Sequence, residues 1–212
     1  MLQLDKWRYF HGENSITFCV LGGFDKQQIT SMLRHAYWNK PKGESPKSTN
    51  ENEIEYVHLF PNFGKRYGYG EPDGIIITNR FVVYVEFELK DPSSDKSDSF
   101  FVRQMNKFML LARDLAADKR KRLRKMFEGE FSFFGKTALR RLFQHLMSSD
   151  MRLPCFLAVS QGKRGETHER LVKLLCPFGD KIVGWSNYRS LVRSGKGKRF
   201  GLKRVVNDVL GK

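Results

Sequence analysis

Acidic residues and a lysine alternate at the end of one apolar segment, FVVYVEFELK, which starts at Phe81. Alternate side chains of an extended strand share a face, so Glu86, Glu88 and Lys90 would project together, away from the apolar residues between them. Asp73 precedes them in the segment PDGIIIT. Neighbouring like charges destabilise a sheet unless a cation lies among them, and hard oxygen ligands are those that Mg²⁺ prefers. The pattern therefore predicts a divalent-metal site.

The two segments predict a β-hairpin, because apolar runs flank a turn-forming pair at 79–80. A two-residue turn would put Asp73 opposite Glu86, whereas a longer, shifted loop would put it opposite Glu88. In either register, Asp73 lies close to both Glu86 and Glu88. The alternative is a ladder of charges on the solvent-exposed face of an edge strand, where charged residues discourage aggregation. That alternative does not account for the aspartate across the hairpin.

These residues resemble the signature of the PD-(D/E)xK nuclease superfamily, with Pro72-Asp73 as its first element and Glu88-Leu89-Lys90 as its second. The resemblance implies a restriction-endonuclease-like core in which Asp73 and Glu88 hold Mg²⁺, with Mn²⁺ as a substitute. It also implies that Lys90 orients or activates the attacking water and stabilises charge in the transition state.

Two further residues resemble features of the same superfamily. Glu13, which opens the first expected helix, is similar to the acid that completes the metal site in many members; compensation of the helix dipole is its ordinary role. Gln104, in FVRQMNKF, resembles a glutamine that some branches have near the active site, and a surface glutamine is the alternative. Glu86 departs from the commonest pattern, so it is an extra ligand, a ligand of a second metal or a partner of Lys90. The choice between Glu86 and Glu88 as the main ligand stays open.

The elements around these residues predict an α/β domain with a mixed central sheet flanked by helices. A first helix is expected at 13–37, broken at Gly22-Gly23, and its second part begins with a capping box at Asp25. Polar, proline-containing residues at 39–52 predict a surface loop with weak order. The other expected elements are strands near 54–60, 73–78, 81–90, 154–160 and 181–185, and helices near 100–127, 136–147 and 166–175.

Charge is distributed unevenly along the chain. Residues 1–100 carry a net charge of −2 and residues 101–212 a net charge of +17. Such asymmetry favours a polyanionic partner, and nucleic acid fits better than a membrane surface. Basic stretches at 119–125, 136–141 and 189–204 could contact phosphates or form solvated helix faces. The last is the preferred DNA-binding segment, and its named contacts are Lys196, Lys198, Arg199, Lys203 and Arg204.

Length and composition favour one domain, residues 1–212, with a packed aromatic core. Of the 212 residues, 40% are hydrophobic and 18 are Phe, which excludes disorder for most of the chain. No apolar run is long enough for a membrane span, and Cys19, Cys155 and Cys176 are odd in number and widely spaced. The expected location is cytoplasmic and reducing.

The expected function is that of a Mg²⁺-dependent deoxyribonuclease that hydrolyses phosphodiester bonds. A noncatalytic nucleic-acid-binding or architectural protein on the same fold is the alternative, and an RNA-cleaving nuclease is a further one. DNA is the expected partner. A homodimer or larger nucleoprotein assembly would allow one site per chain to cut two strands.

Overall fold

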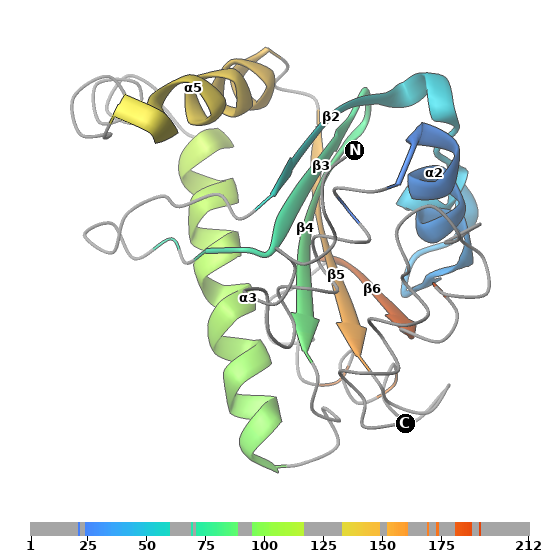
Figure 1. Cartoon of the computed structure of the whole chain (residues 1–212). Helices are drawn as coiled ribbons and strands as arrows, with labels where there is room; N and C mark the ends of the chain where they lie inside the picture. Colours follow the sequence, from blue (N-terminus) through green and yellow to red (C-terminus); the bar gives the residue numbers. More distant parts are fainter. Residues whose placement is uncertain are drawn as a thin grey trace, which may run out of the picture.

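Six strands form one mixed sheet in the computed structural model, in the order β1-β6-β5-β4-β3-β2 (Figure 1). The structure describes residues 24–59, 71–88, 95–116, 133–148, 152–160 and 181–187, together with Leu21, Tyr69, Glu169, Lys173 and Leu191. The backbone alone is described at 88, 95–102, 115–116 and 133–139. The strands are β1 (Tyr37–Trp38), β2 (Ile54–Leu59), β3 (Gly74–Thr78), β4 (Phe81–Glu88), β5 (Leu153–Ser160) and β6 (Ile182–Asn187).

Helices cover both faces of this sheet. Helix α2 (Lys26–His35) lies on one face, and α3 (Asp95–Ala116) and α5 (Phe133–Met147) lie on the other (Figure 1). Alternate residues of β4 separate into the two cores: Val83 and Val85 pack on the α2 side, and Val82 and Tyr84 on the α3 side. The chain is therefore an α/β protein with helices flanking a mixed sheet, as the sequence predicts.

Strand direction changes at β4. Strands β2, β3 and β4 form an antiparallel meander, whereas β4, β5 and β6 are parallel to one another. Parallel strands need long crossover connections, and helices on both faces bury their near-continuous apolar runs. The carboxyl ends of the three parallel strands consequently meet at one edge, where Glu88 pairs with Ser160 and Ser160 pairs with Asn187.

The hairpin has the register that a two-residue turn at 79–80 predicts. Gly74 pairs with Val85, and Ile77 pairs with Val82. The hydroxyl oxygen of Thr78 accepts hydrogen bonds from the backbone N of Arg80 at 3.2 Å and of Phe81 at 2.8 Å, which closes the turn. The edge-strand alternative is wrong, because β4 lies between β3 and β5 and its described side chains are all buried.

The capping box that starts α2 is confirmed. Oδ1 of Asp25 accepts from the backbone N of Gln28 at 2.8 Å, and Oε1 of Gln28 accepts from the backbone N of Asp25 at 3.0 Å. The helix ends at His35, earlier than predicted, because Tyr37 and Trp38 extend as β1 and pair with β6. A tertiary partner, which the local pattern does not contain, decides that boundary.

The connection at 39–52 is more regular than its composition predicts. It contains three 3₁₀ turns, at Lys42–Glu44, Pro46–Ser48 and Glu51–Glu53. Ser45 and Thr49 are buried, and the Arg34 side chain donates from Nε to the Thr49 carbonyl at 2.9 Å, so this segment packs against α2.

Other boundaries also differ from the predictions. Helix α3 begins at Asp95, before the expected start near residue 100, and α5 begins at Phe133, before the expected start near residue 136. The parts of the expected helices at 13–20 and 117–127 lie outside the described residues, and the one at 166–175 is described only at Glu169 and Lys173, both helical.

Two further observations bear on the predictions about membrane spans and cysteines. Within the described ranges, no helix is both long and apolar enough to cross a membrane. Cys155 is a buried free thiol, and burial raises its pKa. Cys19, Cys176 and the basic C-terminal segment at 189–212 lie outside the described residues, apart from Leu191.

Candidate active site

Asp73 lies immediately before β3, where the main-chain ladder to β4 ends. Pro72 precedes it and has no N–H to donate to the neighbouring strand. The Asp73 side chain instead accepts the backbone N–H of Phe87, with 2.7 Å between Oδ2 and N. Continuing the register of β3 and β4 by one residue puts Asp73 opposite Glu86. The first acid of the predicted cluster is therefore held against the strand that carries the others.

Glu86 is a carboxylate in the interior of the sheet, on β4, with only 4% of its surface exposed. Strand alternation puts it on the α3 side, the side of Tyr84, and Gln104 of α3 donates from Nε2 to its Oε1 at 3.4 Å. Burying an ionised carboxylate costs several kcal/mol unless donors, a counter-ion or a metal compensate. Apolar packing alone does not explain an acid at this position.

Gln104 connects α3 to Glu86 through its Nε2, and its side-chain oxygen accepts no hydrogen bond from the described residues. That oxygen, Oε1, is buried. Buried polar atoms nearly always have a partner, so such an oxygen is a position for a bound water molecule or a metal ion. The resemblance based on FVRQMNKF predicts this glutamine near the acids, and the structure brings it into contact with Glu86.

The oxygen atoms of Asp73, Glu86 and Gln104 fit a hard divalent cation in chemical type. Among the side chains that the structure describes, no group of three or more His, Cys, Asp or Glu residues is arranged to hold a metal. Mg²⁺ does not require such a cage, because it commonly uses one or two carboxylates and keeps several waters or substrate oxygens as its other ligands. The two described carboxylates meet that requirement.

The remaining predicted site residues are described in part or not at all. Glu88 is the last residue of β4, and its backbone pairs with Ser160. Lys90 and Glu13 lie outside the described residues, as do the predicted DNA contacts Lys196, Lys198, Arg199, Lys203 and Arg204. Their roles stay predictions.

One buried polar pair is not predicted by the sequence reasoning above. The hydroxyl of Tyr69 donates to Oδ2 of Asp114 at 3.0 Å, and each residue is 6% exposed. This bond fixes the segment before Asp73 to α3. The sequence contains a signal for it, since Asp114 continues the three-residue spacing of Met105, Phe108 and Leu111, which are core positions of α3.

Tyr84 shows that the face of β4 expected to be polar is largely core. The tyrosine is 1% exposed, and its ring stacks on Phe108 and Phe156 with centroid distances of 5.9 and 5.7 Å. Burial raises the pKa of its hydroxyl. Glu86 therefore lies next to an aromatic core and not on a solvent-exposed face.

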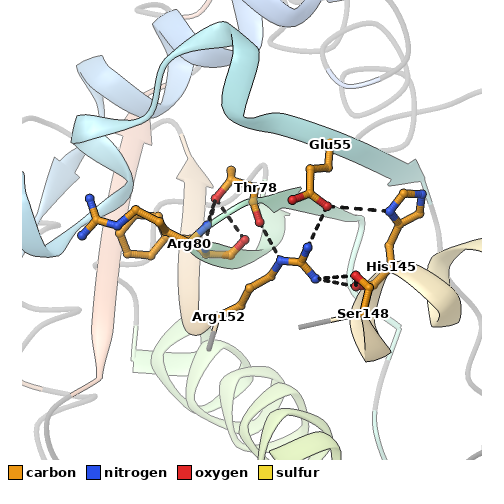
Figure 2. Close-up of polar contacts among 7 residues, drawn as sticks. Glu55, Thr78, Arg80, His145, Ser148 and Arg152 are labelled. Carbon is orange, nitrogen blue, oxygen red and sulfur yellow. Dashed lines mark hydrogen bonds and ion pairs between the residues drawn. The ribbon is translucent and has the colours of Figure 1, made fainter. Parts of the chain in front are cut away.

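The second polar cluster of the described residues lies at the other end of β3 and β4, around the hairpin turn (Figure 2). Arg152 donates to the Thr78 carbonyl at 2.7 Å and to the Glu55 carboxylate at 2.7 Å, and it also contacts the His145 carbonyl and the Ser148 hydroxyl. The His145 ring stacks on Tyr56 with centroids 4.5 Å apart. These contacts fasten the end of α5 to β2 and β3, which is a structural role.

A polar groove of about 560 Å³ lies on the α2 side of the sheet. Its lining comes from α2 and from the segment around Asn50, and it includes neither the carboxylates nor Gln104. The groove is thus separate from the candidate active site.

Comparisons of the chain with protein-family models, with curated proteins and with solved structures find no match. The fold itself places the chain in the α/β class, with a mixed six-stranded sheet.

Proposed function

We propose that the chain is a divalent-metal-dependent nuclease that hydrolyses phosphodiester bonds in DNA, with a restriction-endonuclease-like core. One observation carries the proposal: Asp73 is fixed by the Phe87 N–H opposite Glu86, a carboxylate buried in a central strand and contacted by Gln104. The order of elements adds support, because this hairpin is followed by helices and then by a strand parallel to β4.

In this proposal Asp73 and Glu86 are the residues that hold the metal, with Glu88 as a further carboxylate on β4. A bound Mg²⁺ would lower the pKa of a coordinated water and offset negative charge on the phosphate. Gln104 holds one oxygen of Glu86 in place through its N–H group. Lys90, two residues beyond β4, would stabilise the negative charge that develops on the phosphate oxygens.

The test is cleavage of supercoiled, linear and single-stranded DNA and of a structured RNA, with Mg²⁺, with Mn²⁺ and with EDTA. Asp73→Asn, Glu86→Gln and Lys90→Ala should each lower the cleavage rate by about 100-fold or more, since each removes several kcal/mol of transition-state stabilisation. Glu71→Gln is the matched control, because Glu71 is exposed and lies two residues before Asp73. It should cut at the wild-type rate.

A second panel separates the two glutamates. If Glu86 is the main ligand, Glu86→Gln should need a higher Mg²⁺ concentration for half-maximal cleavage than Glu88→Gln, and the reverse order would assign that role to Glu88.

Full activity of Asp73→Asn would reject the site. Binding of the DNA panel without cutting under any metal would reject the enzyme and favour a noncatalytic nucleic-acid-binding protein. Cleavage of the RNA alone would change the substrate class.

A further inference from the structure

Helix α3 has a basic face on the side away from the sheet. Arg103 and Arg113 are exposed and Lys107 is half-exposed, whereas Met105, Phe108 and Leu111 are buried against the strands. At about 100° per residue, the three cations occupy roughly a third of the helix circumference, opposite Met105, Phe108 and Leu111, and the buried Asp114 lies within the same third. Arg103 and Arg113 are ten residues apart, or about 15 Å along the helix axis.

Cations outnumber carboxylates among the described side chains of α3 and α5. The one acid among them, Asp114, is 6% exposed and accepts the Tyr69 hydroxyl; it also lies 3.4 Å from Nε of Arg113. The Arg113 side chain is nevertheless 68% exposed. Helix α5, in the same layer, adds the exposed residues Arg140 and Arg141. The helix layer on this side of the sheet therefore presents cations to the solvent.

The basic face begins at Arg103, which is adjacent in sequence to Gln104, and the Gln104 amide contacts Glu86. A polyanion that lies along α3 from Arg103 to Arg113 would thus have one end next to the candidate active site. In duplex DNA each strand has a phosphate about every 3.4 Å along the axis, so a length of about 15 Å spans roughly four phosphates per strand.

Anionic lipid is the other partner that cations attract, and this face lacks the apolar half that an interfacial helix inserts into a membrane. Among the described residues, Leu153 is the one large hydrophobic side chain that is exposed, and it belongs to β5. The apolar side of α3 is buried in the core. Charge without exposed apolar surface fits the phosphate backbone of a nucleic acid.

We propose that the basic face of α3, formed by Arg103, Lys107 and Arg113 and continued by Arg140 and Arg141 of α5, binds the phosphate backbone of duplex DNA and leads it to the carboxylates. The inference rests on the proposed function for the role of the carboxylates, but binding itself needs only the cations. Such contacts position DNA without selecting a sequence.

The test measures binding of the full chain to a duplex of random sequence in EDTA, where no metal-dependent cutting occurs, from 50 to 300 mM salt. Each lost phosphate contact reduces the slope of log K against log salt by about 0.9, so the triple variant R103Q/K107Q/R113Q should reduce it by about two to three. Glutamine preserves helix propensity. The matched control is K26Q/K42Q/K47Q, which removes three exposed lysines on the α2 side and should leave the slope unchanged.

The outcomes separate this inference from the proposed function. Equal slopes for the wild type and the α3 triple, or a larger loss in the α2-side triple, would overturn the basic face as the DNA-binding surface, even if the protein cuts DNA. Binding to vesicles that contain anionic lipid, without binding to the duplex, would also overturn it. A reduced slope in a protein that never cuts would support the basic face and reject the nuclease.

Discussion

The two helix layers enclose the same sheet but differ in the residues that they bury. On the α2 side, the buried polar residues are uncharged and include Thr30, Ser45 and Thr49. On the α3 and α5 side, the interior contains the carboxylates of Glu86 and Asp114. Since a buried charge costs far more than a buried hydroxyl, the acids on the α3 side need compensating partners that the hydroxyls on the α2 side do not.

The solvent-facing surfaces differ in the same way. Residues 24–53 around α2 contain five Lys or Arg and four Asp or Glu, which is close to balance. The described side chains of α3 and α5 expose cations and no carboxylate. The α2 side thus combines uncharged buried polar residues with a nearly balanced surface, whereas the α3 side combines buried acids with exposed cations. The second combination is the one that the proposed nuclease would need.

The largest expected difference in stability concerns the arginines that hold the helices. Arg152→Met should lower the free energy of unfolding by about 2–3 kcal/mol, because it leaves Glu55 and two carbonyl groups without a buried charged donor. Arg34→Met on the α2 side removes one hydrogen bond of an exposed arginine and should cost about 1 kcal/mol or less. Urea unfolding measures both. Equal losses would mean that the two layers are held with equal strength.

The next two substitutions each remove a buried side-chain oxygen that has no hydrogen-bond partner among the described residues, one on the α2 side of the sheet and one on the α3 side. Thr30→Val removes a hydroxyl that makes no hydrogen bond with the described residues, so it should raise the free energy of unfolding by about 1 kcal/mol and leave cleavage unchanged. Gln104→Met removes an oxygen of the same kind together with the donor to Glu86, and it should lower the cleavage rate by about 10- to 100-fold. Unchanged cleavage in Gln104→Met would make that glutamine structural.

The smallest expected effect depends on pH. Burial lowers the pKa of His58 on β2, so the folded state disfavours the protonated imidazole. The unfolded chain then binds a proton more readily, and stability is lost as the pH falls below the usual histidine value of about 6.5. His58→Gln should therefore lose less stability than the wild type between pH 7.5 and 5.5, as measured by urea midpoints. An unchanged loss of stability in His58→Gln would show that another group causes the pH dependence.

Sequence reasoning identifies the local features well. The hairpin, the capping box at Asp25 and the strands that flank the acids are predicted because turn chemistry, side-chain alternation and capping act over a few residues, and the structure shows the first of the two registers that the sequence allows. The boundaries that it misses, at His35 and Asp95, depend on partners or on helix propagation beyond those few residues.

The sequence alone determined which residues could share a face of β4, because side chains alternate with a period of two, and it limited Asp73 to a position across from Glu86 or Glu88. It could not determine that β4 is an interior strand, that Tyr84 and Glu86 are buried under α3, or that Asp114 meets Tyr69. Those facts follow from long-range packing. Only the tertiary structure decided that Glu86 and Asp114 lie in a low-dielectric interior, where an ionised carboxylate needs a partner.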